Sequence, residues 1–370
     1  MKDQSRRQFI QSCIYCALSG VISTSIPLIA SCNKKEKSTS LINGLEREEK
    51  SRTSITRTAH INPDFQPPYL KLHRNGELKR RGEELWNIMK SCRLCPRKCG
   101  AQRLNGQRGF CGSTSQLEIA SYHPHYGEER SLVGTGGSGT IFLTNCGLRC
   151  VFCINWEISQ GGRGKPRSIE NMAEMILHLQ EMGCHNINFV TPTHYSPHII
   201  LAIDRAASKG LRLPLVYNTC GWERLEILRK LDGIIDIYLP DFKYADDKMS
   251  AKYSSDADTY PEITKKALLE MNRQVGVAKP ASDGLMYRGL MIRHLVMPNR
   301  VGRTKDVIQW IARNLPKDTY FNIMSQYTPV YKAFEYPEIS RKINREEYVE
   351  AVQWAEEAGL TNLDIQGYRF

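Results

Sequence analysis

Seven of the twelve cysteines in this chain of 370 residues fall between Cys92 and Cys153, and their spacing suits metal chemistry. The overall cysteine content is too low for a disulfide scaffold. Thiolates two to four residues apart converge on one metal centre more readily than they pair across a fold. The cluster of cysteines therefore predicts ligation of a soft metal or an iron–sulfur cluster.

The downstream part of this group is a C-x3-C-x2-C array formed by Cys146, Cys150 and Cys153, directly after an apolar run at 140–144. A [4Fe–4S] cluster normally takes four cysteines, so three thiolates leave one iron open for another ligand. The alternatives are a zinc knuckle without its fourth ligand, or three buried thiols. The spacing and the position after a predicted strand favour the cluster.

The upstream part of the group is a C-x2-C-x3-C-x11-C array. It consists of Cys92, Cys95, Cys99 and Cys111. Four thiolates suit a closed tetrahedral zinc or a second iron–sulfur cluster, and Gly106, Gly109 and Gly112 allow the chain to reverse tightly. Zinc would stabilise a small module, whereas a second cluster would relay electrons. The sequence does not separate these, and unligated thiols are a third interpretation.

The elements that position these loops alternate between short β-branched runs and apolar-periodic helices. Strands are predicted at 140–144, 187–190, 215–217, 234–239, 290–297 and 320–323, and helices at 168–182, 197–209, 222–231, 262–275, 304–314 and 345–358. Such repeated βα units predict an α/β fold with a parallel sheet. Six strands suit a partial (β/α)6 barrel of the TIM type, whose chemistry gathers at the carboxyl ends of its strands.

Further motifs follow these predicted strands. They are Asn186–His194, Tyr217–Trp222, Asp236–Lys243, Ile292–Pro298 and Asn322–Tyr327. Together with the three-cysteine array, they make the chain resemble the radical S-adenosylmethionine (SAM) superfamily. Within it they resemble the glycyl-radical-enzyme activases, in a branch named for the pyruvate formate-lyase activating enzyme. The resemblance runs from about Cys92 to Leu360.

The resemblance implies a radical SAM core in which Cys146, Cys150 and Cys153 hold a [4Fe–4S] cluster and SAM chelates the open iron. It implies reductive cleavage of SAM to methionine and a 5'-deoxyadenosyl radical, with flavodoxin or ferredoxin as electron donor. The radical would abstract hydrogen from a glycyl radical protein. A small molecule or an envelope lipid is an alternative substrate, and a lipid-anchored iron–sulfur electron carrier that does not cleave SAM is an alternative from another class.

The resemblance also assigns cofactor contacts residue by residue. Phe152 would lie against the adenine. Thr191, Thr193 and His194 occupy the segment where many relatives have Gly-Gly-Glu-Pro to hold the amino group of SAM. A carboxylate is missing there, so backbone carbonyls or threonine hydroxyls would have to serve. Asn218 stands where activases often carry aspartate.

Four more residues complete the predicted cofactor site. Asp241 and Lys243 would orient the methionyl carboxylate or the ribose, and Arg293 and His294 lie at the end of the next strand. The ordinary alternative for the first pair is a surface ion pair, with a similar alternative for the second. Cys220, also at a strand end, is either a hydrogen donor or a small buried side chain.

Other conspicuous residues have simpler expected roles. Cys184 is expected to be structural, and His123 and His125 to lie in an ordinary loop. The glycine-rich run 134–139 precedes a strand instead of linking a strand to a helix, so it does not fit a dinucleotide-binding loop. It predicts close packing of the backbone at the entrance of the barrel.

The amino terminus resembles a twin-arginine export signal. Residues 5–11 contain Arg6 and Arg7, and a long uncharged stretch ends in a lipobox-like sequence at Cys32. Cys32 would then anchor the protein to a membrane through a lipid, the alternative being an unprocessed cytoplasmic protein. The predicted organisation is a signal at 1–32, a tether and entry segment at 33–85, a four-cysteine module at 86–133 and the barrel at 134–370.

Composition limits the remaining classes of protein. Hydrophobic residues make up 41% and charged residues 24% of the chain, which is typical of a globular protein and excludes a disordered one. The net charge of +12 favours acidic partners. No nucleic acid is expected as a partner, because the basic stretch 92–111 offers only Phe110 for stacking on bases.

Overall fold

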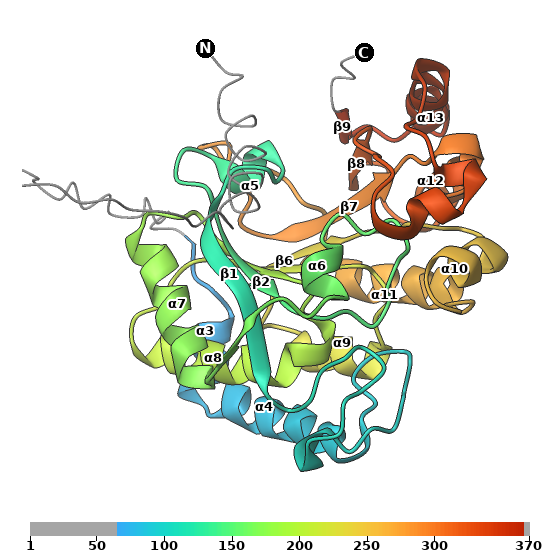
Figure 1. The fold of residues 1–370 in the computed structure, drawn as a ribbon. Coiled ribbons are helices and arrows are strands. Elements are labelled where there is room, and N and C mark those ends of the chain that lie inside the picture. Colours follow the sequence, from blue (N-terminus) through green and yellow to red (C-terminus); the bar gives the residue numbers. More distant parts are fainter. Residues whose placement is uncertain (1–64, 366–370) are drawn as a thin grey trace, which may run out of the picture. The chain divides into compact units, whose positions relative to one another are not determined.

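The computed structural model of this protein describes residues 65–365 (Figure 1). The predicted export signal, Cys32 and the first part of the predicted tether lie outside the described residues and stay predictions. Within the described range, no helix is both long enough and apolar enough to cross a membrane.

One mixed sheet of nine strands organises the fold, in the order β3-β1-β2-β4-β5-β6-β7-β8-β9. The strands are β1 (Leu117–His125), β2 (Ser138–Leu143), β3 (Lys165–Arg167), β4 (Ile187–Val190), β5 (Leu215–Thr219), β6 (Ile237–Pro240), β7 (Gly289–Leu295), β8 (Tyr320–Met324) and β9 (Leu363–Ile365). The six predicted strands are β2 and β4 to β8, and each pairs in parallel with the next. The prediction of a largely parallel α/β sheet is therefore confirmed, and it agrees with a radical SAM partial barrel.

The edges of the sheet were not predicted. β1 pairs antiparallel with β2 on one side and with β3 on the other, while β9 extends the parallel part beyond β8. β1 was missed because its polar and aromatic residues give no clear apolar run. His123 and His125 lie on this strand and contact Phe142 of β2, so the expectation that they occupy a loop was wrong.

Helices connect the strands. They are α3 (Tyr69–Arg74), α4 (Glu77–Ile88), α5 (Arg130–Val133), α6 (Trp156–Ser159), α7 (Ile169–Glu181), α8 (Ser196–Ser208), α9 (Leu225–Leu231), α10 (Asp247–Tyr253), α11 (Tyr260–Val275), α12 (Thr304–Asn314) and α13 (Arg345–Glu357), with short 3-10 turns such as Thr193–Tyr195 and Tyr331–Glu335. The predicted helix after residue 168 begins as expected. The Ser168 hydroxyl accepts the Asn171 N–H at 3.0 Å in a capping box, and Met172, Ile176 and Leu179 are buried.

The later part of the segment predicted as a tether and entry region forms two helices, α3 and α4, which were not among the predicted helices. α4 packs along α8, and its Leu78 and Leu85 are buried. Gly82 lets the two helices approach closely, because a Cβ atom added there would lie 2.7 Å from the Leu201 side chain. The stretch 77–88 is therefore an amphipathic helix that docks on the barrel, and its apolar periodicity was overlooked next to the charged residues around it.

Two apolar clusters lie on opposite faces of the sheet. The larger one fills the space between the sheet and helices such as α7, α8 and α11, which lie outside the strands in Figure 1. The smaller one joins Leu132 of α5 to Val216, Leu239 and Met291 on the inner face of the strands. This inner cluster closes the end at which the parallel strands begin, so the end at which they finish is left for chemistry.

The glycine-rich run 134–139 packs closely against the barrel, as predicted. A Cβ atom added to Gly136 would fall 1.9 Å from the Gly183 carbonyl oxygen, and one added to Gly139 would fall 2.7 Å from the Asn186 carbonyl oxygen. Only glycine fits such approaches of one backbone to another. The run therefore fixes where β2, and with it the three-cysteine loop that follows, enters the sheet.

Candidate functional site

The three-cysteine loop leaves the carboxyl end of β2, and each of its sulfur atoms has a polar neighbour. The Leu148 N–H points to Cys146 Sγ at 3.4 Å, and the Ser254 hydroxyl donates to Cys150 Sγ at 3.1 Å. Ser159 Oγ lies 3.2 Å from Cys153 Sγ. A thiolate accepts hydrogen bonds far better than a neutral thiol does. The surroundings of all three sulfurs therefore suit metal-bound thiolates.

Backbone hydrogen bonds from distant segments hold this loop in place. The Val151 N–H donates to the Tyr253 carbonyl at 2.9 Å, and the Lys332 N–H donates to the Val151 carbonyl at 3.0 Å. Arg149 adopts a positive φ of 53°, which an L-residue reaches at a cost of about 1 kcal/mol or more. The loop conformation is thus imposed by the fold around it.

Burial makes ionised thiols costly here without a metal. Cys150 is 8% exposed, and desolvation raises the pKa of its thiol to about 12, although the nearby Lys243 opposes this. Desolvation also raises the pKa of Cys146. A metal ligand must be a thiolate, so binding of a cationic cluster would release these protons. No set of three or more Cys, His, Asp or Glu side chains in residues 65–365 is already arranged around one ion.

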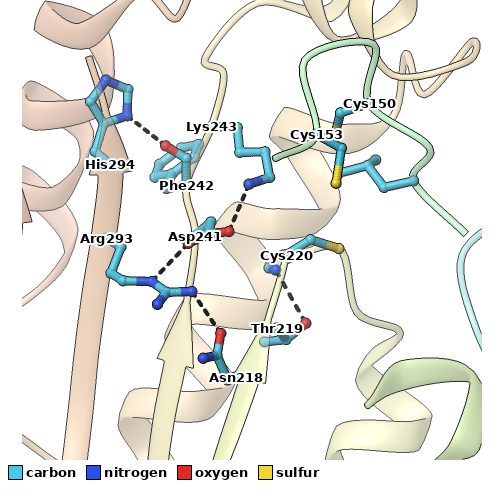
Figure 2. A network of polar contacts seen from close by, with 12 residues as sticks. Cys150, Cys153, Asn218, Thr219, Cys220, Asp241, Phe242, Lys243, Arg293 and His294 are labelled. Atoms are coloured by element: carbon cyan, nitrogen blue, oxygen red, sulfur yellow. Dashed lines mark hydrogen bonds and ion pairs between the residues drawn. The ribbon is translucent and has the colours of Figure 1, made fainter. Parts of the chain in front are cut away.

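A buried network of charges lies at the ends of β5, β6 and β7 (Figure 2). The Lys243 ammonium contacts Asp241 Oδ2 at 2.6 Å, and Arg293 Nε donates to Asp241 Oδ1 at 2.9 Å. Arg293 Nη2 donates to Asn218 Oδ1 at 2.6 Å. Asp241, Lys243 and Arg293 are each only about 15% exposed at the side chain. The surface ion pair considered as an alternative for Asp241 and Lys243 is therefore wrong.

This network fixes the ionisation of its members. Desolvation would raise the pKa of Asp241, but the Arg293 and Lys243 charges outweigh it and lower the pKa. Desolvation would lower the pKa of Lys243, but the Asp241 carboxylate outweighs it and raises the pKa. Both groups therefore stay charged at neutral pH, and they lie close to the three-cysteine loop.

Two glutamates that the sequence analysis did not select reach the same place from the segment between β1 and α5. Glu128 accepts hydrogen bonds from Asn188, Asn218 and Arg293, each at 3.2 Å. Glu129 accepts from Asn322 Nδ2 at 2.9 Å. Desolvation raises the pKa of both carboxyls against the opposing charge of Arg293. No sequence signal marked them, because they follow the strand that was not predicted.

The structure does not bring His294 or His194 to this network. Neighbouring residues of a strand point to opposite faces, so His294 lies on the outer face when Arg293 lies inside. Its Nδ1 contacts the Phe242 carbonyl oxygen at 2.6 Å and its Nε2 contacts Thr304 Oγ1 at 2.9 Å. His194 Nε2 contacts the Thr144 carbonyl oxygen at 2.8 Å. Burial lowers the pKa of His294 to about 4 and that of His194 to about 3, so both rings are neutral structural groups.

A carboxyl group from the next loop, that of Glu223, lies beside Thr193. The Thr193 hydroxyl donates to Glu223 Oε1 at 2.6 Å, and the Thr219 hydroxyl donates to the same oxygen. The other oxygen, Glu223 Oε2, has no hydrogen-bond partner among the described residues. Thr191 adopts a φ of 60°, a strained value for a β-branched residue. Glu223 directly follows the Tyr217–Trp222 motif, and this position in the sequence could have marked it as a candidate site residue.

Glu223 makes stability depend on pH. Burial raises its pKa to about 7 from an ordinary value of 4.5, so the folded state favours the protonated acid. The stability that this proton provides is complete below about pH 4.5 and is lost as the pH rises to about 7. Relative to Glu223→Gln, the free energy of unfolding of the unmodified protein should fall by about 3 kcal/mol across this interval.

Urea titrations of both proteins at several pH values measure this difference. Glu262→Gln is the matched control, because it removes an exposed carboxyl on α11 and leaves Glu223 in place. A constant difference between Glu223→Gln and the unmodified protein from pH 4.5 to 7 would show that Glu223 is not buried as an acid.

Three further predicted positions have clear surroundings. Phe152 is buried, with its ring centroid 5.9 Å from that of Tyr327 and 6.3 Å from that of Tyr244. Cys220 lies at the end of β5, near enough to Cys146 for the two thiols to interact electrostatically, and burial raises its pKa. Cys184 is fully buried in the outer core, which agrees with a structural role.

The comparisons with known proteins agree with this arrangement. Residues 140–287 match the family model of the radical SAM superfamily. The chain is 33% identical over 284 residues to the uncharacterized protein MJ0674 of Methanocaldococcus jannaschii, covering 74% of this chain and 77% of that protein. It is 23% identical over 265 residues to the uncharacterized protein MJ0808 of the same organism, covering 66% and 73%. The chain belongs to the radical SAM superfamily.

Membership makes this a radical SAM enzyme, which cleaves SAM with a [4Fe–4S] cluster. An electron carrier that does not cleave SAM is accordingly disfavoured. The residues present fit these groups: Cys146, Cys150 and Cys153 offer three donor-surrounded sulfurs, and the buried charges of Asp241, Lys243 and Arg293 lie beside them. The cluster and SAM together supply the one-electron cleavage that produces a 5'-deoxyadenosyl radical.

Proposed function

We propose that this enzyme uses its radical chemistry to activate a partner protein by removing a hydrogen atom from it, as a glycyl-radical-enzyme activase does. The observation that carries the proposal is an apolar rim directly beside the three-cysteine loop. We define this rim as Ile154, Trp156, Tyr331 and Phe334. Ile154 is 77% exposed and Phe334 is 64% exposed. Exposed apolar groups gathered at one place mark sites of contact with other macromolecules.

The rim is built by two segments that meet. Ile154 directly follows Cys153, and the Trp156 and Tyr331 rings stack with centroids 5.0 Å apart and planes only 8° apart. The Lys332 hydrogen bond to Val151 ties the second segment to the cluster loop. A protein segment bound on the rim would therefore lie next to the loop and shield the radical from water.

Several residues of the chain are proposed to position the cluster and SAM. Cys146, Cys150 and Cys153 are proposed to hold the cluster, and Phe152 to contact the adenine of SAM. Asp241, Lys243, Arg293 and Asn218 form a fixed set of charges and dipoles for the polar parts of SAM. Thr193 and Glu223 are proposed to receive its amino group, because Glu223 Oε2 is a buried polar atom without a partner in the described structure and an ammonium beside it would favour the ionised carboxylate. Thr191, whose N–H donates to the Asn218 carbonyl, shapes this segment.

The test uses the anaerobically reconstituted enzyme, SAM and a low-potential reductant, incubated with candidate glycyl radical proteins. An activase leaves a stable organic radical on its partner, which electron paramagnetic resonance (EPR) detects after the enzyme has been removed. Ile154→Asp combined with Phe334→Asp should reduce radical formation on the partner at least about tenfold, while SAM cleavage without the partner persists. Equal radical formation by this variant would contradict docking at the rim.

A small-molecule substrate is the second candidate, favoured by buried acceptor atoms inside the barrel. Glu129 Oε2, Asn188 Oδ1 and Asn322 Oδ1 are buried and have no hydrogen-bond partner in the part of the chain that is described. Buried polar atoms usually have partners, so these atoms would suit a substrate that carries amine or amide donors. Release of 5'-deoxyadenosine that depends on such a compound, with no radical on any protein, would favour this candidate.

A further inference from the structure

We propose that Cys92, Cys95, Cys99 and Cys111 bind a second, redox-active iron–sulfur cluster that passes electrons to the three-cysteine centre. The proposal rests on the radical SAM function above, because only a redox enzyme needs such a relay. The sequence was compatible with either zinc or a second iron–sulfur cluster at these cysteines, and we favour the cluster.

The four cysteines are gathered by a tightly folded segment. The Cys92 N–H donates to the Ala101 carbonyl at 2.9 Å, and the Gly100 N–H returns to the Cys92 carbonyl at 3.0 Å. A Cβ atom added to Gly109 would lie 3.4 Å from Cys99 Sγ and 3.5 Å from Cys111 Sγ. The Cys95 thiol is close enough to interact electrostatically with the other three. The segment therefore holds the four cysteines near one another, although in residues 65–365 their sulfurs are not yet arranged around one ion.

A buried arginine indicates that these sulfurs carry negative charge in the working protein. Arg103 is fully buried, and none of the ion pairs found within residues 65–365 includes it. Its guanidinium donates to the Thr114 and His194 carbonyls and approaches Cys92 Sγ at 3.7 Å. A buried cation without a counter-charge is costly. Four thiolates around a metal centre, with a net negative charge, provide the missing counter-charge.

Four thiolates around zinc would supply the same negative charge as an iron–sulfur cluster, but the position of the site favours a redox role. A Cβ atom added to Gly147 would lie 3.4 Å from Cys95 Sγ, so Cys95 packs against the residue that follows Cys146. Arg97 Nε donates to the Gly147 carbonyl at 2.9 Å, and Arg97 Nη2 donates to the Ser254 carbonyl at 2.8 Å. The same Ser254 donates through its hydroxyl to Cys150 Sγ. The two cysteine loops are thus in direct contact.

One cysteine of the four-cysteine site is open to solvent. Cys99 is exposed, whereas Cys92 and Cys111 are buried. If a reduced electron-donor protein docked at Cys99, only the four-cysteine site would lie between it and the three-cysteine loop. Electrons tunnel efficiently over short distances only, so two centres in contact form a path from the surface to a buried centre. A structural zinc would need neither the exposed ligand nor the contact with the second loop.

The electron balance of the relay is simple. The proposed reductant is a low-potential flavoprotein or ferredoxin, which undergoes a one-electron oxidation. The four-cysteine centre accepts that electron and gives it to the three-cysteine centre, so its own state is unchanged at the end. No proton or leaving group is transferred in these steps.

The first test uses a full-length variant in which Cys146, Cys150 and Cys153 are all alanine, so that every bound metal belongs to the four-cysteine site. After anaerobic loading with ferrous iron and sulfide in the presence of equimolar zinc, we expect about four irons per chain. Dithionite should add one electron per chain and produce an EPR signal that SAM does not change. One zinc without iron, no metal, or iron that accepts no electron would overturn the proposal.

The second test measures the relay itself. When both centres of the unmodified protein are reduced, their close contact should couple their electron spins. This magnetic coupling should split the EPR signals by an amount that does not change with microwave frequency. A Cys99→Ser variant should be reduced at the three-cysteine centre at least about tenfold more slowly by reduced flavodoxin than the unmodified protein, yet normally by dithionite. Uncoupled signals, or equal reduction by flavodoxin, would refute the relay. Absent 5'-deoxyadenosine in the unmodified protein would refute the radical SAM function instead, whatever the variant binds.

Discussion

Replacing Cys150 by alanine should reduce the release of 5'-deoxyadenosine by more than about 100-fold. Removing a residue that only supports a metal ligand costs about 10- to 100-fold, and removing a ligand itself should cost more. Cys150 is the most constrained of the three ligands, because its sulfur receives the Ser254 hydroxyl and its carbonyl accepts from Gln160 at 2.8 Å. Two thiolates would be left to hold a cluster that needs three. The measurement is chromatographic quantification of 5'-deoxyadenosine after anaerobic incubation with SAM and dithionite.

Cys184→Ala is the matched control for this experiment. Cys184 is also a buried cysteine, but it belongs to neither cysteine array and lies between α7 and β4, against Gly139. Its replacement removes one sulfur atom and should cost about 1 kcal/mol of stability with little change in turnover. Full turnover by the Cys150 variant, or an equal loss in both variants, would contradict the assignment of the cluster ligands.

Replacing Arg293 by methionine should lower the free energy of unfolding by about 3–5 kcal/mol, the usual cost of removing one partner from a buried ion pair. Arg293 donates to Asp241, Glu128 and Asn218. Without it, the buried carboxylates of Asp241 and Glu128 lose most of their compensating charge. We also expect SAM cleavage to be lost, because Asp241 then binds Lys243 alone and the charges beside the cluster loop rearrange.

Lys266→Met provides the control, since it breaks an ion pair with Glu262 on the exposed surface of α11. Water screens an exposed ion pair of this kind, so this change should be nearly neutral. Urea denaturation measures both variants. An effect of Arg293→Met as small as that of the control would show that the charged network is solvated and not part of a preorganised site.

Much of the fold could be predicted from the sequence, because parallel strands buried on both faces leave strong apolar signals. The strand at 187–190 was predicted with its observed bounds, and the helix predicted at 168–182 is observed as Ile169–Glu181 with Ser168 as its cap. The antiparallel edge at 117–125 was not found, because its side chains are mixed and half-exposed. The apolar face of 77–88 was hidden by charged residues that form exposed ion pairs.

The candidate site was predictable where chemistry depends on spacing along the chain. The cysteines of each array lie near one another because each array is local in the sequence. Asp241, Lys243 and Arg293 meet because the ends of parallel strands share one edge of the sheet. Glu128 and Glu129 were not predictable, since they reach the network from a connection outside the βα repeat. His294 was assigned to the site because its neighbour Arg293 belongs there, and the alternation of side chains along a strand separates the two.

The central claim is that three protein thiolates hold a cluster whose remaining iron is free to bind SAM. Mössbauer spectroscopy of 57Fe-loaded protein, with and without SAM, tests it most directly when Cys92, Cys95, Cys99 and Cys111 have been replaced by serine, so that one cluster remains. We predict about four irons per chain, of which one changes its isomer shift when SAM is added while the other three do not. Four equivalent irons that SAM leaves unchanged would contradict the claim.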